Sequence, residues 1–463
     1  MKEELLRPDK GQSATAIHLV NKDGFAAFAQ TLSGPQRAAL AAQKFTGAGY
    51  QVAIVPDGDA WFAVGGVKDP AELSSWCMAK LAEELPAGIY RRADGEPAAA
   101  VHGWQTAQYR FTRYREDKDA TGPRVLLTKD AKAIEPALAE ARAVALVRDL
   151  VNTPAEDMGP AALEAEAEKL AKAHGAQLAV TKGEALEREY PMVHAVGRAA
   201  ARSHAPRMLH LTWGDAKAPA VAIVGKGVCF DSGGLDIKPA AGMLLMKKDM
   251  GGAAHALALA GLVMGAGLKL RLHCLVPAVE NAIAGNAFRP GDVLGSRKGL
   301  TVEIGNTDAE GRLILADALA RASEEQPALV LDFATLTGAA RVAVGPDLPA
   351  LFARRDETAE ALLAAGEAHD DPCWRLPLHE AYAEWLKSDI ADTGNAHANA
   401  FAGASVAALF LDKFVGAKED GTPIDWAHFD TFAWRPSAKP GRPKGGDALG
   451  LRAAWHMLHE RYG

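Results

Sequence analysis

The sequence predicts an α/β protein with two α/β domains, the larger of which is C-terminal and holds a mixed, mostly buried sheet flanked by helices. Three observations lead to this prediction. The chain has 463 residues, more than one hydrophobic core usually holds. Strand-like runs alternate with helical ones along the chain. In the C-terminal part these runs are continuous in valine, isoleucine and leucine, which is typical of strands buried on both faces.

Residues 1–130 are predicted to form the N-terminal domain. Helices are expected over 34–45 and 71–85, where apolar residues recur with helical spacing. Short runs rich in apolar and β-branched residues predict three strands, at 16–20, 51–57 and 61–67. No functional residue is assigned to this domain.

An alanine-rich helix over residues 131–152 is expected to connect the two domains, because it ends at the turn-forming stretch NTPAEDMGP. Residues 153–463 then form the larger domain. Its buried strands are expected at 219–230, 268–279, 301–305 and 327–336.

Composition and charge exclude several classes of protein. The formal net charge is -7 without a long basic run, so the chain lacks the electrostatic footprint of a nucleic-acid-binding protein. No uninterrupted apolar segment is long enough to span a bilayer, and the first residues lack the apolar core of a signal peptide. A cytoplasmic protein without membrane partners is expected. The four cysteines are scattered, so neither a disulfide framework nor a thiolate metal site is expected.

Charged residues cluster where the predicted C-terminal strands end. Lys226 and Asp231 follow one strand, Asp308 and Glu310 follow another, and Asp249 stands where a helix begins. Open α/β sheets place their ligands at the carboxyl ends of their strands. Small residues flank the four carboxylates, which lets the backbone approach a ligand or another loop closely.

Each of these residues also has a structural alternative. Asp249, Asp308 or Glu310 alone could cap a helix or complement its dipole. Lys226 in GKG could suggest a phosphate loop. However, Ala220 stands where that motif needs its first glycine, and no serine or threonine follows the lysine. The phosphate-loop interpretation therefore fails.

Taken together, the four carboxylates indicate a metal site. Carboxylates that converge without a cation repel one another and raise each other's pKa values. Two divalent metals about 3.5–4 Å apart resolve this conflict, and such pairs activate water and polarise a carbonyl or phosphoryl oxygen. Other catalytic patterns, such as HExxH and GxSxG, do not occur in the chain, and no histidine has ligand spacing.

Four motifs resemble those of the leucyl aminopeptidase family of dinuclear metallopeptidases. They are GKGVCFDSGGLDIKP (225–239), MKKDMGGAA (246–254), NTDAEGRL (306–313) and ATLTGA (334–339). NTDAEGRL is a specific signature of that family. The resemblance implies that the larger domain is a catalytic metallopeptidase domain that hydrolyses the N-terminal residue from short peptides.

The resemblance also implies a set of metal ligands. One metal is expected to be held by Lys226, Asp231, Asp249 and Glu310, and a more exchangeable one by Asp231, Asp308 and Glu310. The two divalent ions are expected to be zinc or manganese, with magnesium as a third choice. Lysine ligates a metal only as the neutral amine, and burial beside a dication favours that form.

Further roles follow from the same resemblance. Lys238 is expected to contact the substrate carbonyl oxygen and stabilise the tetrahedral intermediate. Arg312 is expected to hold a bicarbonate ion that acts as general base, because arginine cannot lose its proton but its fork suits a planar carbonate. Met246, Thr335 and Gly338 are expected to line the pocket for the first side chain. The family resemblance also implies a homohexamer that admits small peptides with a free N-terminus.

Substrate preference and two rival functions stay open. Residues 433–453 depart from the pattern of animal members, so the far wall of the first-residue pocket is unassigned. A dinuclear phosphoesterase could use the same carboxylates, although such sites usually include histidines. A DNA-binding role would need a basic stripe in the N-terminal domain, where acidic residues accompany the arginines of YRRADG and YRFTRYRE.

Overall fold

The computed structural model of the chain describes residues 4–116 and 122–463. They form two compact units, Met1–Ala145 with Ser437–Lys444, and Leu146–Pro436 with Gly445–Gly463. Both units are α/β, and the second contains a large mixed sheet with helices on both faces. The predicted fold class is therefore confirmed.

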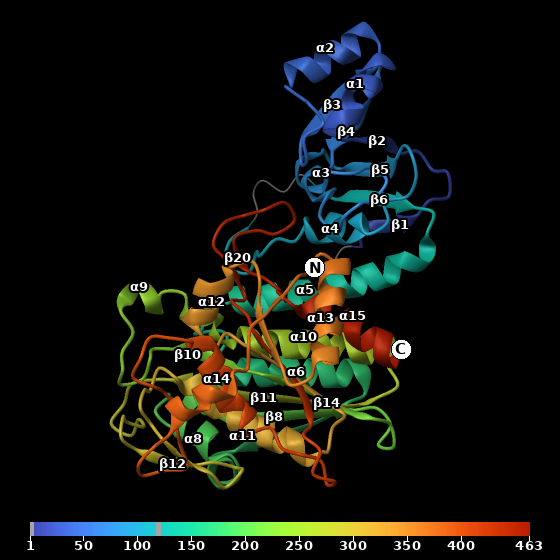
Figure 1. The fold of residues 1–463 in the computed structure, drawn as a ribbon. Helices are drawn as coiled ribbons and strands as arrows, with labels where there is room; N and C mark the ends of the chain where they lie inside the picture. Colours follow the sequence, from blue (N-terminus) through green and yellow to red (C-terminus); the bar gives the residue numbers. More distant parts are fainter. Residues whose placement is uncertain (1–3, 117–121) are drawn as a thin grey trace. The chain divides into compact units, whose positions relative to one another are not determined.

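The first unit is built on a six-stranded sheet with the order β1-β6-β5-β2-β4-β3 (Figure 1). The edge strand β3 pairs antiparallel with β4, and the other pairs are parallel. The strands are β1 Leu6–Pro8, β2 Thr15–Val20, β3 Val52–Asp57, β4 Ala60–Gly66, β5 Gly88–Arg92 and β6 Arg124–Thr128. The helices are α1 Lys22–Gln30, α2 Gly34–Ala42, α3 Ala79–Glu84 and α4 Ala100–Thr106.

Successive side chains along the strands of this unit point to opposite faces of the sheet, and each face carries a hydrophobic cluster. In β4, Ala63 contributes to one cluster and its neighbours Phe62 and Val64 to the other, because successive strand residues point to opposite faces. The predicted helix over 71–85 begins only at Ala79. The carbonyl of Ser75 instead accepts a hydrogen bond from the backbone N–H of Gly103 (2.9 Å), which ties this stretch to α4 rather than to a helical turn.

The second unit holds a nine-stranded sheet with the order β16-β15-β18-β14-β9-β11-β8-β7, and β10 pairs with β11 beyond the end of β9. The central pairs are parallel, whereas β7, β8 and β15 run antiparallel to their main neighbours. The strands are β7 Gln177–Lys182, β8 Arg207–Trp213, β9 Ala220–Gly225, β10 Gly227–Asp231, β11 Arg271–Asn281, β14 Leu329–Ala334, β15 Ala350–Ala353, β16 Trp374–Arg375 and β18 Asp425–Asp430.

Smaller sheets and the helices complete this unit. The small sheets use β12 Val293–Gly295, β13 Thr301–Glu303, β17 Thr393–Gly394, β19 Trp434–Arg435 and β20 Gly445–Gly446. The helices are α5 Ile134–Asn152, which passes from the first unit into the second, α6 Pro160–His174, α7 Gly183–Glu189, α8 Pro191–Gly197, α9 Ala240–Met243, α10 Gly251–Ala266, α11 Glu310–Glu324, α12 Gly338–Val344, α13 Asp356–Ala368, α14 Gly403–Asp412 and α15 Leu451–Tyr462.

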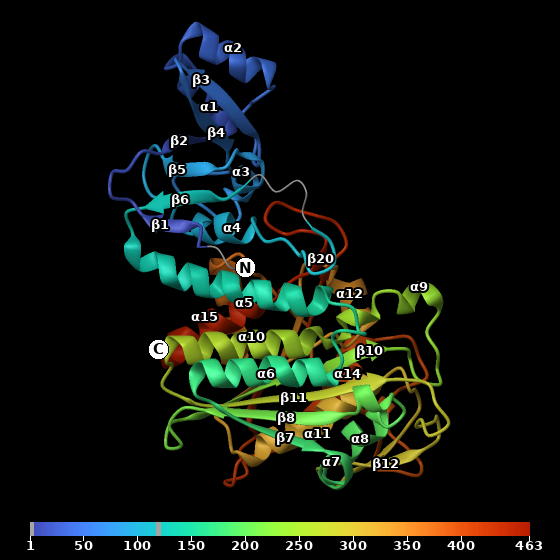
Figure 2. The same ribbon diagram turned by 180° about the vertical axis from the view of Figure 1, so that it is seen from behind.

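Helices cover both faces of the large sheet (Figure 2). Helices α6 and α10 lie along one face, and α8 and α11 lie along the other. A large hydrophobic cluster fills the space between the sheet, α8, α11 and α14. Burial of both faces explains why the central strands are continuous in apolar residues.

The predicted strand at 219–230 is interrupted in the structure. It divides at Lys226 into β9 and β10. The backbone N–H of Lys226 donates to the carbonyl of Phe333 (2.9 Å) at the end of β14. Lys226 therefore lies between the two strands, and its side chain contacts Asp249 and Glu310.

The sequence analysis expected no apolar segment long enough to span a membrane, but one helical stretch meets that criterion. By length and composition alone, Met246–Ala266 could cross a membrane, since its 21 residues have a mean hydropathy of 1.2 in the apolar window. Within the fold, 83% of that window is buried, as in the core helix of a globular unit. The cysteines are free thiols, as expected.

Candidate metal centre and active site

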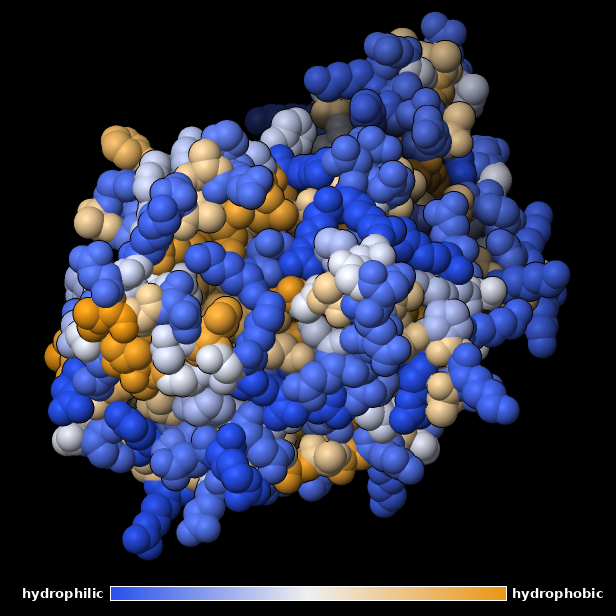
Figure 3. Space-filling view, turned by 60° about the horizontal axis from the view of Figure 1, so that its bottom comes forward, coloured by the Kyte–Doolittle hydropathy of each residue, from blue (hydrophilic) through white to orange (hydrophobic). Residues whose placement is uncertain are grey.

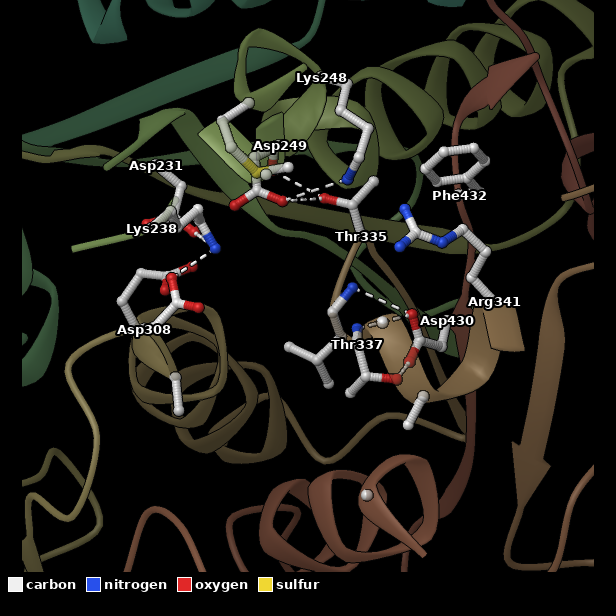
Figure 4. A pocket seen from close by; sticks show the side chains of 18 of the residues that line it. Asp231, Lys238, Lys248, Asp249, Asp308, Thr335, Thr337, Arg341, Asp430 and Phe432 are labelled. Atoms are coloured by element: carbon white, nitrogen blue, oxygen red, sulfur yellow. Dashed lines mark hydrogen bonds and ion pairs between the residues drawn. The ribbon is translucent and has the colours of Figure 1, made fainter. Parts of the chain in front are cut away.

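A cavity of about 570 Å³ lies where β9, β14 and β18 end (Figure 4). Open α/β sheets commonly bind ligands at this edge. Its lining includes all ten residues that the sequence analysis assigned to a site: Lys226, Asp231, Lys238, Met246, Asp249, Asp308, Glu310, Arg312, Thr335 and Gly338.

The side chain of Lys226 reaches the cavity past Gly311, where a larger residue would leave no room for it. Its Nζ lies 2.7 Å from Asp249 Oδ2 and 3.0 Å from Glu310 Oε1, and donates to the Thr335 carbonyl (3.2 Å). A Cβ atom at Gly311 would lie 2.6 Å from this Nζ and 2.5 Å from Cε. The small residue at the start of α11 is thus needed to seat the lysine.

Replacement of Gly311 by alanine is expected to displace Lys226 and lower aminopeptidase turnover by roughly tenfold or more, the range seen when support for a metal ligand is lost. Metal content per subunit, determined by elemental analysis, should fall with activity. Gly265→Ala on α10 is the matched control, because its Cβ would meet only an ordinary contact at 3.6 Å. Unchanged activity and metal content in Gly311→Ala would show that the gap is not required.

Asp231, the last residue of β10, is held in place by a buried asparagine. Its Oδ1 accepts hydrogen bonds from the Gly233 N–H (2.9 Å) and from Asn281 Nδ2 (2.9 Å). Asn281 also donates to the carbonyl of Thr307 (3.1 Å), which joins β10 to the loop before α11. With Oδ1 occupied, the other oxygen of Asp231 faces Lys238 Nζ at 2.8 Å.

Asp249 stands in the short 3-10 turn Met246–Met250 that leads into α10. Its side chain is buried, and its Oδ1 accepts a hydrogen bond from Thr335 Oγ1 (2.7 Å). Thr335 Oγ1 also lies 3.0 Å from the Asp249 carbonyl oxygen. The hydroxyl therefore fixes the carboxylate and leaves Oδ2 directed to Lys226.

Asp308 and Glu310 come from the loop before α11 and from the first residue of that helix. Asn395 holds the loop, because its amide donates to the Asn306 carbonyl (2.7 Å). Glu310 is 1% exposed, and at the helix start its negative charge is favourably placed. Two carboxylates are thus presented to the cavity two positions apart.

The charges in this cluster are not balanced by its two lysines. Burial, with the nearby Asp231, raises the pKa of Glu310 to about 8. Burial and the same neighbour raise the pKa of Asp308 to about 6, although Lys238 opposes this rise. Burial disfavours the ammonium form of Lys226, but the surrounding carboxylates outweigh burial and raise its pKa. A further positive charge would stabilise the carboxylates.

The donor set fits divalent metal ions. One carboxylate oxygen from each of Asp231, Asp249 and Glu310 lies within 4.8 Å of the others. Glu310 Oε2 is buried and has no hydrogen-bond partner among the described residues. Oxygen and nitrogen ligands of this kind suit zinc, manganese and magnesium. Lys226 can join them once a nearby dication favours its neutral amine.

Arg312 lies in the first turn of α11 beside the cluster. Its Nη1 donates to the Asn395 carbonyl (2.6 Å), while its buried Nε has no partner among the described residues. Burial lowers the pKa of Arg312 to about 10, opposed by Glu310 and Asp430, so the side chain is cationic at neutral pH. His397 also lines the cavity, but it belongs to no group of possible metal ligands among the described residues.

Two histidines without ligand spacing in sequence come together elsewhere in the second unit. His210 Nε2 and His273 Nδ1 lie 3.1 Å apart, and His273 Nε2 is 3.7 Å from Glu325. Glu325 is already paired with Arg321 (2.5 Å). Burial, with Arg321 and Arg271 nearby, lowers the pKa values of both imidazoles, so they are neutral. These arginines disfavour a cation there, and the two neutral imidazoles form a hydrogen-bonded pair beside the ion pair of Glu325 with Arg321.

Comparison with known proteins settles the family. Residues 145–454 match the catalytic domain of the cytosol aminopeptidase family, and residues 15–126 match the N-terminal domain of M17 aminopeptidases. The chain belongs to the cytosol aminopeptidase family. It is therefore a hydrolase, a metal-dependent aminopeptidase of the leucyl aminopeptidase type.

Relatives of the chain support the family assignment over most of its length. Peptidase B of Cronobacter sakazakii is 44% identical over 322 residues, which are 67% of this chain and 74% of that protein. The crystal structure of a cytosol aminopeptidase from Coxiella burnetii has a TM-score of 0.93 and 44% identity, with all of both chains covered. A bottromycin maturation enzyme in complex with Mn has a TM-score of 0.86 and 32% identity, covering 97% of this chain and 99% of that one.

Two features of the chain carry no recognisable signal in its sequence. Asn281 and Asn395 orient ligand-bearing segments, but each acts through partners far along the chain. Residues 15–126 match the N-terminal domain of the family only by comparison, because they carry no catalytic motif.

Proposed function

We propose that the cavity holds two divalent metal ions and removes the N-terminal residue from short peptides, with bicarbonate as general base. The observation that carries this proposal is the convergence of buried carboxylates with Lys226 at the strand ends. Lys226, Asp231, Asp249, Asp308 and Glu310 would hold the ions. Bound ions of this kind polarise a carbonyl oxygen and lower the pKa of water.

The side chains of the protein would divide the remaining tasks. Lys238 Nζ, which contacts Asp231 and Asp308, can donate to the substrate carbonyl oxygen as negative charge develops on it. Arg312 offers a buried Nε–H donor that suits one edge of a bicarbonate ion, which can accept the proton of the attacking water. The free amine of the peptide would bind a metal ion close to Asp249.

The proposed reaction requires metal and a free amine. Dialysis against a chelator is expected to abolish hydrolysis of leucine p-nitroanilide, and addition of Mn²⁺ or Zn²⁺ should restore it. N-acetylation of a peptide substrate should block cleavage, because the acetylated amine can no longer bind. Efficient cleavage of acetylated peptides, or full activity in chelator, would contradict the proposal.

A phosphoesterase could use the same donors, and His397 on the cavity wall adds a residue type common in such sites. However, His397 belongs to no metal-capable group among the described side chains. The family also favours the peptidase. Parallel turnover of leucine p-nitroanilide and p-nitrophenyl phosphate separates the two reactions.

We also propose a cytoplasmic homohexamer that acts on small peptides and has no nucleic-acid or membrane partner. Large apolar side chains that are more than two-thirds exposed support assembly. They are Leu244, Val342 and Phe401. In Figure 3, hydrophilic residues cover most of the visible face and hydrophobic residues gather in patches between them. The net charge of -7 gives no support to nucleic-acid binding.

A further inference from the structure

His397 lines the cavity and has no role in the proposed reaction. Its Nδ1 is buried and has no hydrogen-bond partner among the described residues. The buried Nε of Arg312, which lines the same cavity, is likewise without a partner there. One of these two polar atoms belongs to a titratable ring and the other to a permanent cation, and both are left to contact what enters the cavity.

The loop that carries His397 is tied to the metal-binding loop through Asn395. Asn395 Oδ1 accepts a hydrogen bond from the backbone N–H of Asn306 (3.2 Å), and its backbone carbonyl accepts one from Arg312 Nη1 (2.6 Å). His397 follows Asn395 by two residues, and its ring packs against Trp385 with the ring centres 5.7 Å apart. These contacts keep the imidazole near Arg312, whose charge acts on it.

The imidazole of His397 is neutral at neutral pH. Burial and the positive charge of Arg312 lower its pKa, and an interaction with Asn399 opposes this shift. Arg312 belongs to α11, whereas the 3-10 turn Glu380–Leu386 contributes the uncharged ring of Trp385 and the loop itself contributes Asn399. A neutral imidazole can accept a proton, which a guanidinium cannot do.

We propose that His397 is a catalytic proton carrier that works with the bicarbonate ion held by Arg312. This inference rests on the proposed function. His397 Nδ1 takes the hydrogen of the bicarbonate hydroxyl while another oxygen of that ion receives a proton from the attacking water. His397 then returns a proton by the same route to the leaving amine.

Atoms and charges balance in this proton transfer. The O–H bond of the water breaks as its oxygen bonds to the peptide carbonyl carbon, and an N–H bond forms at His397 Nδ1. When the C–N bond breaks, its electron pair stays on the nitrogen, which gains the proton that Nδ1 gives up. The imidazole and the bicarbonate ion both end unchanged. The second proton of the water ionises from the product acid.

A proton carrier beside Arg312 has an electrostatic advantage. An anion that kept the proton of the water would lose its charge and with it the attraction to the guanidinium. With the proton on His397, the anion stays charged and bound. The guanidinium also disfavours the imidazolium, so His397 releases its proton readily to the amine. Proton carriers work best with a pKa near the operating pH, and imidazole is the side chain whose pKa lies closest to neutrality.

Replacement of His397 by glutamine tests this role, because glutamine keeps a polar side chain but does not titrate. At about pH 8, kcat for leucine p-nitroanilide is expected to fall by about tenfold or more, with little change in KM. The difference should shrink toward parity below about pH 6.5, because protonated His397 in the wild-type enzyme no longer accepts a proton. Equal kcat values in alkaline buffer, or a loss that is the same at every pH, would overturn the proposal.

His379→Gln is the matched control. His379 is exposed, lies against the ring of Tyr382 and is not among the residues that line the cavity. Its replacement should leave kcat and the pH dependence as in the wild-type enzyme. No hydrolysis of leucine p-nitroanilide by the metal-loaded wild-type enzyme would defeat the proposed function. An active wild-type enzyme whose kcat and pH profile match those of His397→Gln would defeat only the role of His397.

Chemical modification gives a readout that does not depend on activity. Diethyl pyrocarbonate reacts with neutral imidazole, and trypsin releases His397 and His379 on separate peptides, 388–413 and 376–387, each with a single histidine. In the metal-loaded enzyme, bicarbonate is expected to slow the modification of His397, quantified by mass spectrometry, and to leave that of His379 unaffected. Arg312→Ala should abolish this protection. Modification of His397 at the same rate with and without bicarbonate would overturn the proposal.

Discussion

Replacing Glu310 by alanine is expected to abolish hydrolysis and remove metal from both proposed sites. Glu310 is 1% exposed, and its Oε2 has no hydrogen-bond partner among the residues that the structure describes. A carboxylate shared by two ions is needed by each of them. The rate should therefore fall by more than the roughly 10²–10³-fold that follows loss of a single stabilising donor. Asp231→Ala should have the same effect, since this residue is the second proposed bridge.

Elemental analysis after gel filtration measures the metal directly. Asp308→Ala is the informative comparison, because Asp308 is proposed to hold only the exchangeable ion and should leave about one metal per subunit. Circular dichroism and thermal unfolding check the fold. We expect the variant to fold, because Lys226 Nζ also lies 2.7 Å from Asp249 Oδ2, a contact that the substitution does not remove. Two full-occupancy metals in folded Glu310→Ala would refute the bridging role.

Site residues that lie close together in the sequence could be predicted, because a single short motif contains them. NTDAEGRL places Asp308, Glu310 and Arg312 at the start of one helix, and the structure keeps all three on the cavity. The buried strands followed from apolar runs for the same reason. The hydrogen bonds that join distant segments of the site could not be predicted from the sequence. Asn281 reaches Asp231 across 50 residues, and a lone asparagine in a loop carries no signal of that contact.

Two predicted boundaries, the strand over 219–230 and the helix over 71–85, differ from the structure for similar physical reasons. The run 219–230 is apolar apart from Lys226 and the two glycines beside it, and the break at this lysine depends on the carbonyl of Phe333 in another strand. The helix expected from residue 71 starts at Ala79, because the Ser75 carbonyl binds Gly103 instead. Tertiary hydrogen bonds override local propensity in both cases.

Arg312→Ala is expected to slow hydrolysis by the roughly 10²–10⁴-fold that accompanies loss of general-base help, while metal content stays near normal. Arg312 is cationic, so it can neither ligate a metal nor accept a proton from water. Its one hydrogen bond to a described residue is donated by Nη1 to the Asn395 carbonyl, and its Nε is left for an anion. In carbonate-free buffer, added bicarbonate should raise the wild-type rate much more than the mutant rate.

A purely structural role for Arg312 makes different predictions. If it only supports Asn395 or balances Glu310, the mutant should lose metal or thermal stability, and bicarbonate should not distinguish it from wild type. Arg321→Ala controls for loss of a cation from α11, because Arg321 pairs with Glu325 at the other end of that helix (2.5 Å). This control should keep the full bicarbonate response. A folded, metal-replete Arg312→Ala enzyme that responds to bicarbonate as strongly as wild type would rule out the anion-binding role, because the ion would then act without the arginine.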